Sequence, residues 1–337
     1  MNNQKDKPTQ VLLTGSAGFI GSCMLQYLNE KGITDIYIVD DFGIEKKRQN
    51  WEQKQYLKNI ERQYLFEWLA EEKPALDIVI HLGARTDTTE FDYAVHEALN
   101  VVYSQKIWNY CAKQNLPLIY ASSAATYGDG SHGYLDENKL AYQLTPLNPY
   151  GRSKNELDKW ALMQEKSPRG WAGLKFFNVY GPNEYHKGRM ASVIFHSFNQ
   201  LHKDGSVKLF RSHRPDFKDG EQLRDFIYVK DVVKVIGWMM DKMLTGGWNS
   251  ELNGLYNLGT GQARSFVDLV TATFKGVDKH PDIVYIDMPV DIRDKYQYFT
   301  EADMNKLREA GYSEPFYSLE TGVDEYVRQY LTGGKTW

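Results

Sequence analysis

Val11-Leu-Leu-Thr-Gly15-Ser-Ala-Gly18-Phe-Ile-Gly21 is the stretch that decides the fold of this chain. A short apolar run, typical of a buried strand, ends in a glycine turn, and apolar residues at helical spacing follow from Ile20 to Leu28. Gly15 permits the tight turn, Gly18 lets the backbone approach a pyrophosphate, and Gly21 lets helix and strand pack closely. The spacing is a variant of the dinucleotide-binding fingerprint, with a plain strand-to-helix turn as the alternative.

Asp40 supports the dinucleotide interpretation. It ends the next apolar run, Ile36–Val39, at about 20 residues after the glycines, where an acidic side chain can hold the ribose hydroxyls. The free N–H groups of the helix that follows the turn would face the anion. The two features together predict a nucleotide site at the carboxyl end of the first strand.

Length and composition indicate an ordinary globular protein with room for a large core. The chain has 337 residues and a formal net charge of −4, which gives no reason to expect a nucleic-acid partner. Cys23 and Cys111 lie in helix-like apolar patterns, which predicts buried free thiols and fits a reducing cytoplasm. No apolar stretch approaches the roughly 18 residues of a membrane span, so we expect a cytoplasmic protein without one.

Strands and helices alternate through the first half of the chain. Apolar runs at 76–82, 116–121 and 174–177 predict buried strands, and a helix is expected from 93 to 114. The segment 42–69 is polar and aromatic, with a helix-like part at its end. The absence of hairpin signals favours a doubly wound (Rossmann) α/β fold with a parallel sheet.

The pattern changes beyond Asn178, where proline, glycine, charges and aromatics alternate, with one helical run at 191–201. Strand and helix order returns at 226–258. We therefore expect a dinucleotide-binding domain and a smaller mixed α/β substrate lobe over the carboxyl edge of the sheet. The domain comprises residues 1–177 plus 224–261, and the lobe comprises 178–223 plus 262–337.

Tyr150-Gly-Arg-Ser-Lys154 is the second informative pattern. A tyrosine and a lysine four residues apart share a helix face, so the ammonium can lie near the phenol and favour the phenolate, which makes Tyr150 a candidate base. In isolation such a pair would indicate only an exposed helix face. Ser123 follows the apolar run 118–121, at the edge expected to face a nicotinamide, and can hydrogen-bond the reacting oxygen.

These patterns together resemble the extended short-chain dehydrogenase/reductase superfamily, most of whose members act on nucleotide sugars. The segment Arg224–Val232 is similar to a superfamily segment in which the arginine clamps the nucleotide diphosphate. Within the superfamily the chain most resembles the ADP-L-glycero-D-manno-heptose 6-epimerases. The matching segments are Thr88–Glu90, Ala121–Gly128, Asn178–Pro182, His186–Gly188, Met190–Ser192 and Tyr296–Gln297.

The resemblance implies an isomerase that inverts C6 of the heptose in ADP-D-glycero-D-manno-heptose, supplying a lipopolysaccharide core precursor. Because an unactivated C–H is a poor acid, inversion requires transient oxidation to a ketone, which turns over before it is reduced again. Its oxygen then occupies two places, so a second acid/base is needed. Lys187 matches the lysine that the family pairs with the tyrosine, and the implied catalytic residues are Tyr150, Lys187, Lys154 and Ser123.

Two other functions stay open at this point. Another nucleotide-sugar epimerase or a 4,6-dehydratase would use the same redox machinery, and a non-enzymatic dinucleotide sensor could use the same fold. The joint presence of Tyr150, Lys154 and Ser123 disfavours a sensor, which needs no proton-transfer set. Without its motif, Lys187 would indicate a solvated charge or a phosphate contact.

The choice of dinucleotide depends on opposing charges. Asp40 favours NAD because a carboxylate repels a 2'-phosphate, whereas Lys47 and Arg62 match residues that the resembled family uses on NADP. We expect NADP, with NAD as the alternative. The implied cofactor-binding residues are Gly15, Gly18, Phe19, Ile20, Gly21, Asp40, Asp41, Lys47, Arg62, Leu82, Gly83, Ala84, Asn100, Lys154 and Val179.

The resemblance also implies a nucleotide-sugar site and a homo-oligomer, described for the family as a pentamer. The substrate residues would be Asn178, Arg189, His196, Phe210, Arg224 and Tyr296. The chain departs from the family pattern at Arg85, Leu99 and Arg189 and in a longer loop at 212–223, which bear on the sugar accepted. His81 and His186 have no metal-ligand spacing with Cys, Asp or Glu, so no metal is expected.

Overall fold

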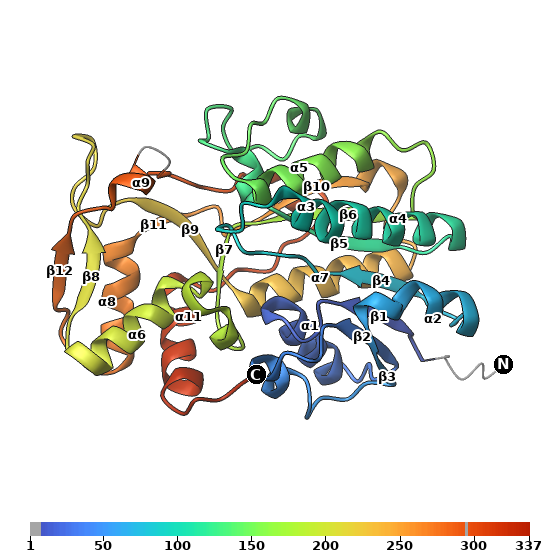
Figure 1. The fold of residues 1–337 in the computed structure, drawn as a ribbon, viewed down its shortest axis with the longest axis horizontal. Coiled ribbons are helices and arrows are strands. Elements are labelled where there is room, and N and C mark those ends of the chain that lie inside the picture. Colours follow the sequence, from blue (N-terminus) through green and yellow to red (C-terminus); the bar gives the residue numbers. More distant parts are fainter. Residues whose placement is uncertain (1–7, 294–295) are drawn as a thin grey trace.

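A seven-stranded parallel sheet forms the centre of the computed structural model, which describes residues 8–293 and 296–337. The strand order is β10-β6-β5-β4-β1-β2-β3 (Figure 1). This order, which grows outward on both sides of β1, confirms the predicted doubly wound fold. The strands are β1 (Val11–Thr14), β2 (Ile36–Asp40), β3 (Lys58–Glu61), β4 (Ile78–His81), β5 (Leu118–Ser123), β6 (Trp171–Phe176) and β10 (Gly254–Leu258).

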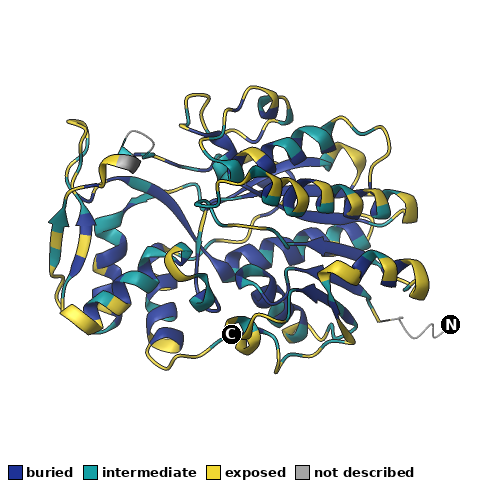
Figure 2. Cartoon of the chain, in the orientation of Figure 1, coloured by how far each residue is buried: buried dark blue, intermediate teal, exposed yellow. Residues whose placement is uncertain are grey.

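Helices cover both faces of the sheet because its strands alternate apolar side chains between two cores. In β1, Val11 and Leu13 face one core and Leu12 faces the other. The first core is closed by α1 (Phe19–Glu30) and α7 (Val229–Leu244), and the second by α2 (Leu65–Glu72), α4 (Tyr103–Gln114) and α5 (Pro149–Leu162). Figure 2 shows buried strands between helices whose outer sides are exposed.

The helix predicted at 93–114 is present, with an irregular middle. It consists of α3 (Tyr93–His96), a π-helical turn (Glu97–Val102) and α4. The wide turn places Asn100 in the interior, fully buried.

The elements outside the central sheet and its covering helices, called the second lobe below, lie beside the carboxyl edge of the sheet (Figure 1). They form a three-stranded sheet, β11-β9-β7, and a two-stranded sheet, β12-β8, with four α-helices among the described residues. The strands are β7 (Asn178–Tyr180), β8 (Val207–Phe210), β9 (Leu223–Tyr228), β11 (Ala263–Ser265) and β12 (Ile283–Ile286). The helices are α6 (Val193–Asp204), α8 (Phe266–Gly276), α9 (Val290–Arg293) and α11 (Leu319–Glu325), whereas α10 (Asn305–Glu309) packs against β10 of the central sheet.

Two strands differ from expectation. β9 falls in the segment expected to belong to the dinucleotide-binding domain, yet it pairs with β7 and β11 rather than with the central sheet. β3 adds an edge strand inside 42–69, where its polar sequence Lys-Asn-Ile-Glu gave no strand signal. The proposed division of the chain into two lobes stays a prediction.

Both cysteines are buried free thiols, as predicted. Across the described parts of the chain, no helix combines the length and apolarity needed to cross a bilayer.

Candidate active site

A cavity of about 570 Å³ opens where β1, β2 and β4 end. Most residues predicted to bind the cofactor line it, and Lys187 lines it too. So do Arg85 and Leu99, two of the positions that depart from the family pattern. The predicted cofactor residues in its wall are Gly15, Gly18, Phe19, Ile20, Gly21, Asp40, Asp41, Lys47, Arg62, Leu82, Gly83 and Ala84.

The glycine turn is packed too tightly for side chains. Gly15 has a φ of +73°, and a Cβ there would lie 2.6 Å from the backbone nitrogen of Gly83. A Cβ on Gly21 would lie 2.0 Å from the carbonyl oxygen of Gly15. The turn therefore leaves a bare backbone cradle at the start of α1, which fits the pyrophosphate of a dinucleotide.

Two carboxylates and two cations face each other in the same wall. Asp40 accepts hydrogen bonds from the backbone N–H of Ala17 at 2.9 Å and from Lys47 Nζ at 2.9 Å. Arg62 lies 3.4 Å from Asp41. Asp40 is thus partly neutralised by Lys47, and both cations stand beside the position expected for the adenosine ribose.

Lys187 reaches the cavity from the second lobe. It belongs to a 3₁₀ helix, Tyr185–Met190, and its Nζ lies 5.3 Å from the ring centroid of Phe19, the first residue of α1. Burial lowers the pKa of Lys187, and the charge of Glu184 opposes this shift. A lysine with a lowered pKa beside a cofactor cavity can give up and take back a proton.

Glu184 anchors the loop that carries Lys187, a role the sequence analysis missed. Its carboxylate is fully buried and accepts hydrogen bonds from Ser192 N at 2.5 Å, Ser192 Oγ at 2.6 Å and Tyr326 Oη at 2.9 Å. Burial raises the pKa of Glu184, while its hydrogen bonds lower it. Glu184 stands three residues before the predicted acid/base, and that short spacing was the available signal.

Tyr150 and Ser123 are brought together at the end of β5. Tyr150 lies beside Ser123, whose hydroxyl accepts a hydrogen bond from Ala125 N at 3.1 Å. Burial raises the pKa of Tyr150, the neighbouring Ser123 hydroxyl lowers it and the charge of Asp158 raises it. This direction is opposite to the shift expected from the spacing of Tyr150 and Lys154, because burial of the phenol dominates.

Lys154 lies beneath this pair. Its Nζ donates to the carbonyl oxygen of Ala121 at 2.8 Å rather than to Tyr150, and burial lowers its pKa to about 8. Tyr150, Ser123 and Lys154 do not line the 570 Å³ cavity. The Tyr150 ring lies 6.3 Å from that of His96 between centroids, and His96 Nε2 lies 3.2 Å from the carbonyl oxygen of Glu90, which does line it.

Three predicted cofactor residues, Asn100, Lys154 and Val179, do not line the cavity, and the side chains of Asn100 and Lys154 are bonded to the protein backbone instead. The Asn100 side chain accepts from Arg85 N at 2.7 Å and donates to Arg85 O at 3.0 Å and to Ser153 Oγ at 3.0 Å. Val179 pairs with Ile227 in the three-stranded sheet. Asn100 therefore fixes the backbone of Arg85, and because Arg85 lines the cavity, Asn100 affects the cavity's shape without lining it.

Three of the predicted substrate residues form an aromatic and cationic group. The Arg224 guanidinium lies 5.2 Å from the ring centroid of Tyr296 and 5.7 Å from that of Phe266, which the sequence analysis missed. Phe210 meets Tyr296 edge to face, with centroids 6.3 Å apart. Arg224 also donates to the carbonyl oxygen of Gln297. The group can present a fixed cation and ring faces to a nucleotide diphosphate.

The other three lie apart from this group. Asn178 is exposed and donates to Asp225 O at 3.1 Å. Arg189 is exposed, and its carbonyl oxygen lies 3.3 Å from His196 Nε2. None of the predicted substrate residues lines the 570 Å³ cavity in the described parts of the chain.

Comparisons with known proteins agree on one relationship. Residues 11–259 match the sequence model of the NAD dependent epimerase/dehydratase family. The ADP-L-glycero-D-manno-heptose-6-epimerase of Fusobacterium nucleatum is 49% identical over 331 residues, covering 95% of this chain and 98% of the relative. The enzyme of the same name from Nitratidesulfovibrio vulgaris is 47% identical over 322 residues, with 95% and 97% covered.

A solved structure is similar to this chain over nearly its whole length and carries the same enzyme name as these relatives. The crystal structure of Helicobacter pylori ADP-L-glycero-D-manno-heptose-6-epimerase superposes with a TM-score of 0.77 at 27% identity, covering 96% of this chain and 98% of that one.

Proposed function

The chain belongs to the NAD dependent epimerase/dehydratase family and, within it, to the ADP-L-glycero-D-manno-heptose-6-epimerases, and we propose that it inverts C6 of the heptose in ADP-D-glycero-D-manno-heptose. The product would be the L-glycero epimer, a precursor of the lipopolysaccharide core. The observation that carries the proposal is the position of Lys187, which lines the same cavity as the glycine turn and Asp40.

Two side chains, Tyr150 and Lys187, share the proton transfers of this reaction. A bound nicotinamide dinucleotide supplies hydride removal at C6 and hydride return to the other face of the ketone. The ketone oxygen occupies different places in the two steps, so each place needs its own acid/base. Tyr150 serves one place, with the Ser123 hydroxyl beside it, and Lys187 serves the other.

Burial suits both groups to these roles. The raised pKa of Tyr150 keeps its phenol protonated, ready to donate to a carbonyl oxygen as hydride arrives. The lowered pKa of Lys187 makes its neutral amine accessible, so it can accept a hydroxyl proton as hydride leaves. The reverse direction exchanges the two roles, as an epimerase requires.

We further propose NADP as the preferred dinucleotide. Lys47 and Arg62 provide two cations for a 2'-phosphate, and Lys47 also neutralises the Asp40 carboxylate that would repel it. Denaturing the purified protein and identifying the released dinucleotide tests this choice. Release of NAD alone would refute it.

The activity is tested with both heptose epimers as separate starting materials. Wild-type protein is expected to approach the same mixture from either side, and loss of water from the sugar would instead indicate a dehydratase. Tyr150→Phe should retain the dinucleotide and lose turnover, and Lys187→Ala should also lose epimerisation. Lys203→Ala, which removes an exposed lysine on α6, is the matched control. A Lys187→Ala protein as fast as wild type would refute the assignment of two acid/base groups.

Location and assembly follow the family resemblance alone. We propose a cytoplasmic homo-oligomer, with the pentamer described for the family as the expected state. Sedimentation equilibrium measures this state, and a monomer at the working concentration would refute it.

A further inference from the structure

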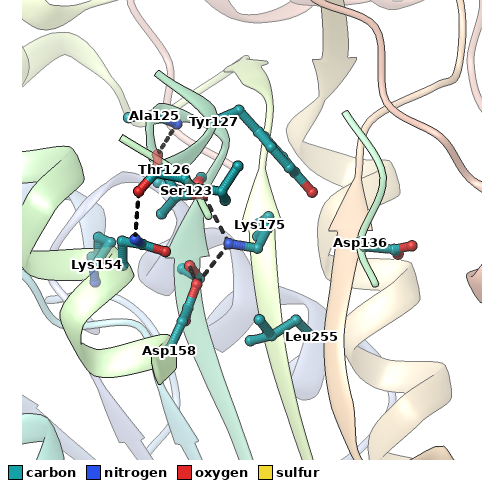
Figure 3. A network of polar contacts seen from close by, with 12 residues as sticks. Ser123, Ala125, Thr126, Tyr127, Asp136, Lys154, Asp158, Lys175 and Leu255 are labelled. Carbon is teal, nitrogen blue, oxygen red and sulfur yellow. Dashed lines mark hydrogen bonds and ion pairs between the residues drawn. The ribbon is translucent and has the colours of Figure 1, made fainter. Parts of the chain in front are cut away.

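A buried ion pair lies behind the end of β5. Asp158 Oδ2 on α5 and Lys175 Nζ on β6 are 2.7 Å apart, and the side chains are 0% and 2% exposed. Figure 3 shows the pair between the strand that ends at Ser123 and the helix that carries Lys154. The two charges touch neither solvent nor the cofactor cavity, and the reaction described above does not use them.

The Asp158 arm of this pair fixes the strand. Its carboxylate accepts hydrogen bonds from Ser122 Oγ at 2.7 Å and from Tyr120 Oη at 3.1 Å. Tyr120 and Ser122 are alternate residues of β5, so both point to the same side of the sheet, toward α5. The carboxylate therefore fixes the carboxyl end of β5 at two residues, against the helix that carries Tyr150 and Lys154.

The Lys175 arm fixes the turn that follows. Lys175 is paired with Ser122 across β5 and β6, and its Nζ donates to Thr126 Oγ1 at 2.8 Å. Thr126 Oγ1 in turn donates to the carbonyl oxygen of Ser123 at 2.8 Å. A chain of two hydrogen bonds thus connects the buried ammonium to the backbone of the serine that contacts Tyr150.

Stability alone does not account for such a pair. Desolvation of two charges offsets most of their attraction, so well-packed apolar residues of similar size often replace a buried pair without loss of stability. Removing one partner is strongly destabilising because a bare charge is left in the interior. The double replacement therefore separates what the pair contributes to folding from what it contributes to the site.

We propose that Asp158 and Lys175 are positioning residues of the epimerase reaction. They fix the end of β5 and the Ser123–Thr126 turn, and so keep the Ser123 hydroxyl in place beside Tyr150. The inference rests on the proposed function. Misplacement of a reacting group by about 1 Å can slow a reaction by about 100-fold. The pair acts on the turnover step, since it touches neither the cavity wall nor the Arg224 group.

The experiment compares Asp158→Leu/Lys175→Met with each single variant and with wild type. Both single variants should unfold at much lower temperature, and the double variant should recover most of the wild-type value. The double variant should keep the wild-type KM and dinucleotide affinity, and its kcat should fall by about 10- to 100-fold. The single variant Lys175→Arg, which keeps the positive charge, should retain most of the wild-type kcat. A double variant with wild-type kcat would overturn the proposal.

A milder variant covers the case in which the double variant does not fold. Thr126→Val removes the hydroxyl between Lys175 and Ser123 with little change of shape, and should lower kcat at unchanged KM. Thr273→Val, which removes a buried hydroxyl bonded to Leu269 O in α8, should leave kcat unchanged. Full kcat in Thr126→Val would refute the inference while wild-type turnover stands. Absence of turnover in wild type would refute the proposed function, and the inference with it.

Discussion

Replacement of Glu184 by alanine tests how the loop of Lys187 is held. The carboxylate accepts three hydrogen bonds, two from Ser192 and one from Tyr326. A buried donor left without an acceptor costs about 1–3 kcal/mol, so the three donors together would cost at most roughly 3–9 kcal/mol. The burial penalty of the carboxylate, visible in its raised pKa, offsets part of this loss. We expect the free energy of unfolding to fall by about 2–4 kcal/mol.

Thermal unfolding and turnover report this change separately. For a chain of 337 residues the entropy of unfolding is about 0.7 kcal/mol/K, so we expect the melting temperature to fall by about 3–6 °C. Turnover should fall as well, because the loop no longer holds Lys187 over Phe19. The pKa of Lys187 should decrease further, since the charge of Glu184 raises it in the wild type.

The control and the refuting outcome are also defined by the structure. Tyr326→Phe removes only one of the three hydrogen bonds, so it should lower the free energy of unfolding by about 1 kcal/mol and leave most of the turnover. If Glu184→Ala unfolds at the wild-type temperature and turns over at the wild-type rate, Glu184 does not anchor the loop.

Three further predictions concern the cofactor cavity and the core. Gly21→Ala should abolish dinucleotide binding in a fluorescence titration, because its Cβ would overlap Gly15 O; Gly247→Ala, where the nearest atoms lie at 3.7 Å, should bind normally. Lys47→Met should weaken NADP by at least about tenfold and NAD much less, as calorimetry with each dinucleotide would show; equal losses would contradict its contact with the 2'-phosphate. Burial raises the pKa of Asp231 from 3.8 to about 6, so the folded state binds this proton more tightly than the unfolded chain. That stabilisation is complete below about pH 4 and is lost as pH rises through about 6, a fall of about 3 kcal/mol. Asp231→Asn should lack this fall in urea unfolding at pH 4 and pH 8, and an unchanged pH dependence would refute the role of Asp231.

Local patterns predicted the parts of the site that depend on neighbouring residues. The turn at Gly15 and the strand that ends at Asp40 are set by spacing within a short segment, and the structure places both in one cavity wall. Lys187 could be assigned only through its motif, because nothing local brings a residue of the second lobe to the first turn of α1.

Non-local contacts explain what the sequence did not predict. The partners of β9 are strands from two other parts of the chain, and its apolar run fits a central strand equally well. The burial of Asp158 and Lys175 depends on packing between α5, β5 and β6, whereas charged residues in a sequence normally indicate an exposed face. The raised pKa of Tyr150 has the same origin, since spacing shows where Lys154 lies but not how much water the phenol loses.

The contact between Phe19 and Lys187 couples the conformation of the glycine turn to the environment of the Lys187 amine. Phe19 follows Gly18 in the cofactor turn, and its ring faces the amine of Lys187. A substitution at position 19 would therefore alter the wall of the cavity and the environment of Lys187 together. Redesign of this cavity should leave position 19 untouched and vary Lys47 and Arg62, which line it beside Asp40 and Asp41.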